Sequence, residues 1–312
     1  MPVKHPIVIG LQFGDEGKGK VTDLFAEKAD WVIRFNGGNN AGHSLEAGGV
    51  KIVTHSVPSG ILYQHTKNYI GCGCVVDPVS LAEEISMIEE AGFQVSPENL
   101  KIDHRVHLTL PIHRALDCAR EQGDGAVGST KRGIGPVYGA KFERRGLRAG
   151  DWSSDEETVK KRLEALCEYY NPCLLSLGQL ESTVEENWKV FLESRKRFGD
   201  YVCYDHAPFY VESKSKKCLM EGAQALLLDI DHGTYPFVTS SNSVGSYASV
   251  GTPFPHSKMG PTIGVAKAYL TRVGEGPMPS EFDGEEAEDL RKRGQEFGAV
   301  SYTHLRAHET LS

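Results

Sequence analysis

A glycine-rich stretch near the N-terminus, Gly14-Asp-Glu-Gly-Lys-Gly-Lys20, most constrains how this chain can fold. An apolar run at 7–11 precedes it, and residues 21–26 can open a helix. Strand, glycine loop and helix in this order form a phosphate cradle, because the loop N–H groups turn inward and the helix N-terminus adds partial positive charge. The spacing from Gly14 to Gly19-Lys20 also matches the P-loop pattern. The sequence therefore predicts a phosphate-binding loop at 14–20.

Two positions depart from the usual P-loop. Val21 stands where a P-loop carries the Ser or Thr that holds Mg²⁺. Asp15 places a carboxylate inside the loop, where it either holds the metal or takes a proton from a reacting group. The alternative is a glycine-rich turn with two surface lysines, which the flanking segments and the spacing disfavour.

The composition bounds the class of protein. A chain of 312 residues can bury a large core in one or two domains, and 39% hydrophobic with 24% charged residues is ordinary for a soluble globular protein. The net charge of −8 argues against nucleic acid as a partner. No apolar run approaches the ~18 residues that a membrane span needs, and the N-terminus lacks a signal-peptide pattern. We therefore expect a cytoplasmic protein with neither membrane nor nucleic acid as partner.

The cysteines and histidines do not form a recognisable metal motif. The seven cysteines are scattered, and Cys72-Gly-Cys74 has neither the spacing nor the second pair of a zinc knuckle. His104 and His107 lie three apart, but nothing nearby in the sequence completes a ligand set. The sequence thus predicts reduced thiols and no transition-metal site.

Strand-like and helix-like segments alternate along the chain. Residues 31–35 and 51–55 have the apolar content of strands. Helices are expected where apolar residues recur at helical spacing, near 81–88, 114–121, 159–170 and 184–192. Ser80 with Glu83, and Ser154 with Glu157, are spaced as capping boxes.

Polar loops rich in hydrogen-bonding side chains follow several of these segments, at 36–44, 128–136, 221–224 and 229–242. Lys131 and Arg132 in the second of them suit an anionic ligand. The alternation predicts an α/β, P-loop-NTPase-like fold with a mostly parallel central sheet flanked by helices. Ligands in such folds bind at the carboxyl ends of the strands.

Several short motifs occur in one order over residues 7–299. They are Gly-Asp-Glu-Gly-Lys-Gly-Lys at 14–20, Asn-Ala-Gly-His at 40–43, Gly-Ile-Gly-Pro at 133–136, Arg-Arg-Gly-Leu-Arg at 144–148, Glu-Gly-Ala-Gln at 221–224, Asp-His-Gly-Thr-Tyr-Pro at 231–236, Val-Thr-Ser-Ser-Asn at 238–242 and Thr-Arg-Val-Gly at 271–274. Together they resemble the adenylosuccinate synthetase family.

The resemblance implies a GTP-dependent ligase of purine (AMP) biosynthesis, which forms a C–N bond between IMP and L-aspartate and needs Mg²⁺. By position, Asp15 would remove the N1 proton of IMP before oxygen O6 attacks the γ-phosphate of GTP. The aspartate amine would then displace phosphate from 6-phosphoryl-IMP. His43 would act as general acid toward the leaving phosphate, Gln224 would help hold the purine, and Lys18 would neutralise charge on the transferring group.

The resemblance also implies the binding sets. Asp15 and the carbonyl of Gly42 would hold Mg²⁺. GTP would contact Gly14, Asp15, Glu16, Gly17, Lys18, Gly19, Lys20, Gly42, His43 and Ser44. IMP would contact Asp15, Glu16, Gly17, Lys18, Asn40, Ala41, Gly42, His43, Thr130, Arg144, Gln224, Thr239 and Val273. The family arginine at the position of Arg144 reaches IMP from the other subunit, which implies a homodimer.

Each position also has a plain structural interpretation. His43 would bond locally in its loop, Arg144 and Arg145 would be a solvated charge pair, and Asp15 would be a metal ligand only. Three further polar residues would cap turns: Gln224, Thr239 and Asn242. The rival classes are a non-catalytic or regulatory purine-nucleotide-binding P-loop protein and a small-molecule kinase. Binding of IMP separates them, because a switch GTPase ignores IMP.

The resemblance stops at Ala299. The family continues with a Thr-Thr-Gly segment and arginines that bind aspartate and IMP, whereas residues 300–310 resemble translated sequencing-library adaptor. We therefore expect a partial catalytic domain at 1–299, with a sheet incomplete at the C-terminus, and a non-native tail at 300–312. The 312-residue chain itself is expected to have little or no activity.

Overall fold

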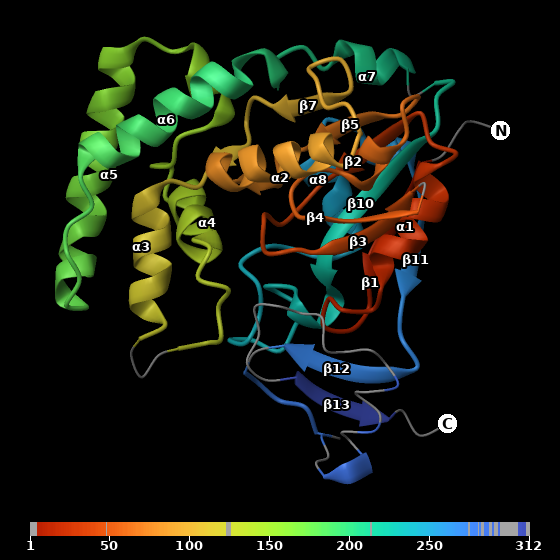
Figure 1. Cartoon of the computed structure of the whole chain (residues 1–312). Coiled ribbons are helices and arrows are strands. Elements are labelled where there is room, and N and C mark those ends of the chain that lie inside the picture. Colours follow the sequence, from red (N-terminus) through yellow and green to blue (C-terminus); the bar gives the residue numbers. More distant parts are fainter. Residues whose placement is uncertain are drawn as a thin grey trace.

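A parallel sheet forms the centre of the molecule (Figure 1). The computed structural model describes residues 5–47, 49–122, 126–212, 214–273, 275–279, 281, 284–286, 289, 293 and 305–309. Within these residues the sheet has seven strands in the order β11-β1-β10-β2-β5-β7-β9, and every neighbouring pair is parallel. The strands are β1 His5–Gly10, β2 Trp31–Arg34, β5 Lys67–Ile70, β7 Leu100–Asp103, β9 Val202–Cys203, β10 Cys218–Ala225 and β11 Met259–Val265. The predicted mostly parallel α/β sheet is confirmed.

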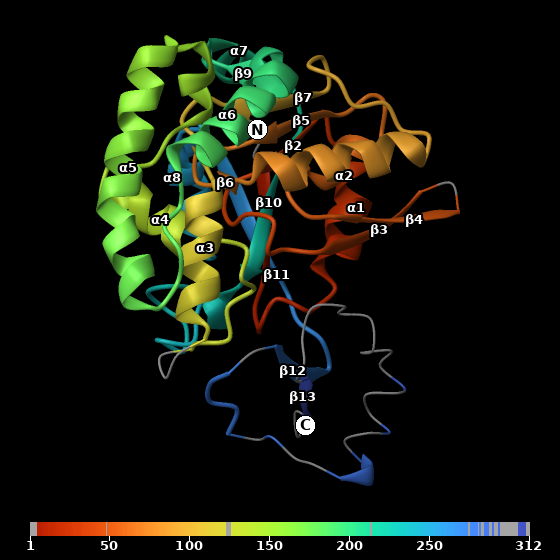
Figure 2. The same cartoon turned by 60° about the vertical axis from the view of Figure 1, so that its left-hand side comes forward.

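Helices flank this sheet, and α3 to α6 form a group at one side of it in both views (Figures 1 and 2). The α-helices are α1 Lys18–Ala26, α2 Pro78–Glu90, α3 Pro111–Arg120, α4 Ile134–Phe142, α5 Glu156–Ser176, α6 Val184–Phe198, α7 Ala207–Glu212 and α8 Ala248–Gly251. Short 3₁₀ turns are η1 Ser59–Leu62, η2 Ala149–Ser153, η3 Gly199–Tyr201, η4 Leu226–Leu228, η5 Gly245–Tyr247 and η6 His256–Lys258.

Three small sheets complete the described part of the chain. β3 His43–Ala47 pairs antiparallel with β4 Val50–Thr54, and β6 Val75–Val76 pairs parallel with β8 His107–Leu108. β12 Tyr269–Val273 pairs antiparallel with β13 Leu305–Glu309. β13 falls in the segment expected to be a non-native tail, while 300–304 and 310–312 lie outside the described residues.

The alternation of side chains along the central strands explains why both faces of the sheet are covered. Val8, Val32 and Leu219 pack with Ala26 of α1 on one face. Their neighbours in sequence point the other way and pack with Phe209 of α7 and Ala248 of α8; they are Ile7, Ile9, Ile33 and Met220. Because a strand buried on both faces has no polar side, these segments read as continuous apolar runs.

The predicted helical middle is confirmed. The inward faces of α5 and α6 belong to the largest apolar core cluster, with Val159, Leu163, Leu166, Tyr170 and Phe191 all buried. Burying each large apolar side chain stabilises the fold by about 2 kcal/mol relative to leaving it in water. This helical layer acts as scaffold beside the sheet.

Both predicted capping boxes are wrong, because a nearby aspartate starts each helix. The carboxylate of Asp77 accepts the N–H groups of Val79 at 3.0 Å and Ser80 at 3.2 Å, with Pro78 at the first helical position. Asp155 caps α5 by accepting the N–H of Thr158 at 2.8 Å. The spacing in the sequence correctly predicted that a helix begins near each position, but it predicted the wrong residue as the N-cap.

Two predicted loop boundaries also change. Residues 221–224, expected as a loop, lie inside β10, because that strand hydrogen-bonds to β1 on one side and β2 on the other. The glycine-rich loop at 128–136 ends at Gly133, where α4 begins. In the described part of the chain, no helix combines the length and apolar character of a membrane span.

Candidate active site

The loop between β1 and α1 has the backbone of a phosphate cradle. Gly14 has φ 99° and Gly17, the N-cap of α1, has φ 74°, both in the left-handed region that favours glycine. No side chain caps the N-terminus of α1, so its first N–H groups remain free to bind an anion. The strand–loop–helix order predicted from 7–26 is therefore present.

Lys18 and Glu16 brace this loop from the inside. The Nζ of Lys18 donates to the carbonyl of Gly14 at 2.8 Å and lies 3.7 Å from Glu16 Oε2. Glu16 Oε1 accepts the N–H groups of Gln12 at 2.9 Å and Gly14 at 2.8 Å. Burial lowers the pKa of the Lys18 ammonium, and the Glu16 carboxylate opposes that shift. Glu16 thus shapes the loop in addition to its predicted ligand contact.

His43, at the start of β3, is buried against the sheet. Its Nδ1 lies 2.5 Å from Oε1 of Glu221 on β10, while its Nε2 is buried and has no hydrogen-bond partner in the described part of the chain. A Cβ on Gly19 would lie 3.2 Å from His43 Cβ, so the bare glycine lets α1 approach this histidine closely. Among the described residues, His43 therefore keeps one nitrogen engaged and one available.

The loop from β2 to β3 carries the predicted ligand residues before His43. Asn40 Oδ1 accepts the N–H of Gly38 at 3.2 Å, and the carbonyl of Ala41 lies 2.5 Å from Nδ1 of His55. Gly42 is exposed. Glu84 of α2 holds the facing segment, because its carboxylate accepts the N–H groups of residues 55–57 at 2.6, 2.8 and 3.0 Å.

Asp15 projects toward the segment that follows β11. Its Oδ2 lies 3.2 Å from Nζ of Lys267 and also accepts a hydrogen bond from Thr271 Oγ1. The backbone of Lys267 is held in turn by Gln12, whose amide accepts at 3.1 Å and donates at 3.0 Å. Asp15 therefore lies beside a cation. A carboxylate and a backbone carbonyl such as that of Gly42 are oxygen donors of the kind that Mg²⁺ prefers, so the chemistry of these two residues fits the ion.

Gln224, the last residue but one of β10, has an unusual backbone conformation. Its φ is +56°, and among the described residues both atoms of its buried amide lack a hydrogen-bond partner. A Cβ on Gly37 would lie 2.7 Å from Gln224 Oε1, so this amide packs directly on the β2 loop. A buried amide without partners costs free energy, which a hydrogen-bonding ligand would recover.

The segment 229–244 is folded around Asp229. This buried carboxylate accepts the N–H groups of Asp231 at 2.9 Å, His232 at 3.0 Å and Val244 at 3.2 Å. Thr239 Oγ1 is buried without a hydrogen-bond partner in the part of the chain that the structure describes, as are the hydroxyls of Ser241 and Ser243. Asn242 donates to Asp231 Oδ2 at 2.6 Å, which favours its structural interpretation as a turn-capping residue.

The loop at 128–133 approaches the same region. Asp117 of α3 accepts the hydroxyl of Ser129 and the N–H of Gly133, each at 2.8 Å, and Arg132 donates to the carbonyl of Asn39. A Cβ on Gly135 would lie 3.4 Å from Ser240 Oγ. The structure thus brings the loops after β2 and β10 together with the loop that carries Thr130, which is half-buried.

Arg144 stands apart from these loops. It follows α4 with φ +62° and is exposed. Within the described residues, no hydrogen bond or ion pair joins its side chain to the loop cluster, that is, to the loops at the carboxyl ends of β1, β2 and β10. The neighbouring Arg145 guanidinium stacks 3.8 Å from the Tyr169 ring, so the two arginines are not a simple solvated pair. Of Val273, only the backbone in β12 is described.

Sequence reasoning missed several residues of the site. Glu221 and Thr271 appeared only as parts of motifs, and nothing singled out Ser59, Glu84 or Lys267. Arg34 was also missed: it is 1% exposed at the end of β2, and its Nη1 has no partner among the described residues. A charged residue inside an otherwise apolar strand was the one available signal, because such residues are rarely buried without a partner.

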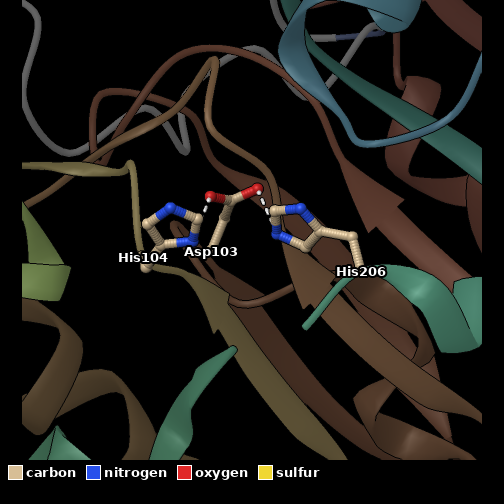
Figure 3. A group of neighbouring side chains, drawn as sticks. All are labelled: Asp103, His104 and His206. Atoms are coloured by element: carbon tan, nitrogen blue, oxygen red, sulfur yellow. Dashed lines mark ion pairs between the residues drawn. The ribbon is translucent and has the colours of Figure 1, made fainter. Parts of the chain in front are cut away.

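A second polar cluster lies at the end of β7 and just beyond its neighbour, the edge strand β9. His104 and His206 lie on either side of Asp103 (Figure 3), with ring nitrogens 3.7 and 3.4 Å from its carboxylate oxygens. The expectation that nothing completes a ligand set around His104 missed His206. Arg105, however, donates to Asp103 through Nε at 2.9 Å and Nη2 at 2.7 Å, and Tyr69 donates at 3.0 Å. Because these donors take both carboxylate oxygens, the cluster is poorly suited to a divalent cation.

The parallel sheet and the glycine loop at a helix N-terminus define a nucleotide-binding α/β protein of P-loop-like architecture. The adenylosuccinate synthetase family model matches residues 7–307, and the chain belongs to that family. It is therefore a GTP-dependent ligase that joins IMP and L-aspartate through a C–N bond to give adenylosuccinate, GDP and phosphate in AMP biosynthesis.

Individual relatives agree. Adenylosuccinate synthetase of Staphylococcus epidermidis is 43% identical over 300 residues, which cover 95% of this chain and 69% of that protein. The same enzyme of Halothermothrix orenii is 43% identical over 305 residues, with 95% and 70% covered. The fully ligated adenylosuccinate synthetase structure of Plasmodium falciparum superimposes with TM-score 0.88 at 32% identity, covering 98% of this chain and 72% of that one. Succinoaminodeoxyadenylate synthetase of cyanophage S-2L, 22% identical with TM-score 0.69, shares the fold.

Proposed function

We propose that the loops at the carboxyl ends of β1, β2 and β10 are the IMP and GTP site of this ligase. The observation that carries the proposal is a group of buried polar atoms that have no hydrogen-bond partner among the described residues and come from different segments: His43 Nε2, both amide atoms of Gln224, and Thr239 Oγ1. Buried polar atoms are normally hydrogen-bonded, so several of them close to a phosphate loop favour a polar ligand at this place. The predicted IMP and GTP residues in 14–20 and 40–44 belong to the same loops.

In this site Asp15 takes the N1 proton of IMP, and oxygen O6 then attacks the γ-phosphate of GTP to release GDP. The ion pair with Lys267 supports this role, because a neighbouring cation favours the charged form of a carboxylate, which is the form that can accept a proton. Lys18 and the N–H groups of the loop offset negative charge on the transferring phosphoryl group. The aspartate amine then displaces phosphate from carbon 6, and His43 protonates the leaving phosphate.

Asp15 and the Gly42 carbonyl would hold Mg²⁺, which neutralises phosphate charge when bound. The absence of a Ser or Thr at Val21 supports this assignment, since another oxygen ligand must then be supplied. Replacement of Asp15 by Asn should lower Mg²⁺ affinity measured by calorimetry in the presence of a GTP analogue.

We also propose a homodimer in which Arg144 serves the IMP site of the partner subunit. Its exposure, and its left-handed backbone at the end of α4, support a role outside its own subunit. Sedimentation analysis tests the dimer, and Arg144→Ala should weaken IMP binding without loosening the fold. A cytoplasmic location is proposed as well, with the seven free cysteines as support. The division into 1–299 and 300–312 stays a prediction.

The decisive test is binding of a non-hydrolysable GTP analogue with and without IMP. The synthetase assignment requires that the chain binds IMP saturably and that His43→Asn or Gln224→Ala weakens ligand binding. A chain that binds the GTP analogue and ignores IMP would instead be a regulatory or non-catalytic nucleotide-binding protein.

A further inference from the structure

Glu221 is a buried carboxylate whose every bond is directed at one histidine and one serine. Its side chain is inaccessible to solvent, at the centre of the sheet on β10. Oε1 receives Nδ1 of His43 at 2.5 Å and the hydroxyl of Ser59 at 2.9 Å, while Oε2 receives the backbone N–H of Ser59 at 2.8 Å. Ser59 opens the turn η1, so its N–H is fixed by the backbone.

The surroundings of His43 leave its ring no other arrangement of hydrogen bonds. Nε2 has no partner among the described residues, so the Glu221 contact is the ring's one hydrogen bond there. Backbone packing holds the ring in place as well, since even a Cβ on Gly19 would lie 3.2 Å from His43 Cβ. The charged groups that act on the ring are Glu221 of β10, Arg34 of β2 and Lys18 of α1.

We propose that Glu221, itself clamped by Ser59, is a positioning residue that fixes His43 in the tautomer with its proton on Nδ1 and its Nε2 directed to the ligand. A carboxylate only accepts hydrogen bonds, so the nitrogen that faces it must carry the proton. Nε2 is then the one nitrogen that can gain and lose a proton without breaking the bond to Glu221. The role of this tautomer in the reaction rests on the proposed function, whereas the presence of the tautomer does not.

The same contacts predict that the substitution Glu221→Gln gives the opposite tautomer of His43. The N–H of Ser59 cannot turn into an acceptor, so the glutamine must place its oxygen at the Oε2 position. Its NH₂ group then occupies the Oε1 position and donates to Nδ1 of His43. The proton of the imidazole must move to Nε2. A nearly isosteric change therefore inverts the tautomer.

Nitrogen NMR of the ¹⁵N-histidine-labelled 312-residue chain tests this directly, because the two ring nitrogens report which of them is protonated. Spectra are recorded without ligand at pH 8, where an ordinary imidazole, with a pKa of about 6.5, is neutral. The His43 signals are assigned by their loss in His43→Asn. We expect the Nδ1–H tautomer in the unsubstituted chain and the Nε2–H tautomer in Glu221→Gln.

The matched control is Asp103→Asn, which neutralises an equally buried carboxylate in the other cluster and should leave the His43 tautomer unchanged. An Nε2–H tautomer in the unsubstituted chain overturns the proposal, and this arm remains valid if Glu221→Gln does not fold. An unchanged tautomer in folded Glu221→Gln also overturns it. Because no ligand is present, the proposal can fail while IMP binding holds, or hold while IMP binding fails.

Discussion

Two groups of buried charged side chains lie at the same carboxyl edge of one sheet, and they differ in what their polar atoms bind. At the end of β7, next to the edge strand β9, Asp103 has both oxygens taken by Arg105 and Tyr69. At the ends of β1, β2 and β10, His43 and Gln224 present buried atoms that no described residue satisfies. The carboxylate of the first cluster is fully hydrogen-bonded, although His206 Nε2 lacks a hydrogen bond among the described residues. The second cluster leaves buried atoms from several loops open.

The comparison teaches that buried charge alone does not mark a ligand site. Burial of a charged group is compatible with a purely structural role when a partner lies beside it. Open donors and acceptors are the more informative observation, because folding gains nothing from them. We therefore assign ligand binding to the loop cluster and structural support to the Asp103 cluster.

The largest expected effect is on stability, from Asp103→Asn. This change leaves Arg105 without its carboxylate and should lower the free energy of unfolding by about 4 kcal/mol. Denaturant unfolding measures it, with Glu157→Gln as control. Glu157 pairs with Lys161 on an exposed face of α5, so its neutralisation should change stability by less than about 0.5 kcal/mol. Equal effects of the two changes would remove the structural role of Asp103.

The pH dependence of stability should differ between Glu84, which supports the loop cluster, and Asp103 of the other cluster. Burial raises the pKa of Glu84 to about 7, since its partners are backbone N–H groups rather than a cation. Burial also acts on Asp103, but the hydrogen bonds and charge of Arg105 outweigh it and lower its pKa. Two carboxylates of similar burial therefore shift in opposite directions.

The sign for Glu84 follows from proton binding. Between pH 4.5 and 7 the folded chain holds a proton on Glu84 that the unfolded chain has released, so stability falls as pH rises through this range. The change amounts to about 3 kcal/mol. Unfolding measured from pH 4.5 to 7 should fall less steeply in Glu84→Gln than in the unsubstituted chain. Asp103 acts in the reverse direction, contributing stability above the ordinary carboxyl pKa that is lost as pH falls below it. Parallel pH curves for Glu84→Gln and the unsubstituted chain would contradict the assignment.

Within the loop cluster, Lys18→Met should weaken binding of a GTP analogue by about 100-fold, because a charge-assisted hydrogen bond to phosphate is lost. Lys28→Met is the matched control. Lys28 is exposed just beyond α1, so this variant should bind the GTP analogue as tightly as the unsubstituted chain does. Calorimetry measures both. An equal loss of affinity in the two variants would show that overall charge, rather than the loop, governs nucleotide binding.

The smallest expected effect is on IMP affinity, from Gln224→Ala. Loss of one or two neutral hydrogen bonds should weaken IMP binding by about tenfold. Stability should hold or rise, because the buried amide has no partner to lose in the free protein. Thermal unfolding and IMP titration of the same preparation give both values. A large drop in stability would mean that the amide is structural.

The sequence predicts the phosphate loop, the parallel sheet and the helical scaffold because each depends on local pattern. Gly14 and Gly17 need left-handed backbone, and apolar residues recur at the period of their element. It does not predict contacts between distant segments. The Asp15 pair with Lys267, and the meeting of Asp103 with His206, depend on which strands become neighbours in the sheet.

Local reasoning also failed where two local signals competed. Ser80 and Ser154 had the spacing of N-cap residues, but Asp77 and Asp155 cap the two helices instead. Glu221 and Gln224 looked like loop residues because they are polar, although both lie within β10 and Glu221 pairs with β1 and β2. A polar residue is tolerated in a central strand only where a buried side chain or a ligand can form hydrogen bonds with it. Glu221 has two such partners, Ser59 and His43.

The most direct test of the account is a calorimetric titration of IMP into the 312-residue chain, Gln224→Ala and Asp103→Asn. The account predicts saturable binding to the unsubstituted chain, about tenfold weaker binding to Gln224→Ala, and unchanged affinity in Asp103→Asn below its unfolding temperature. IMP binding that is absent, or that is lost in folded Asp103→Asn and kept in Gln224→Ala, would contradict the assignment of ligand binding to the loop cluster.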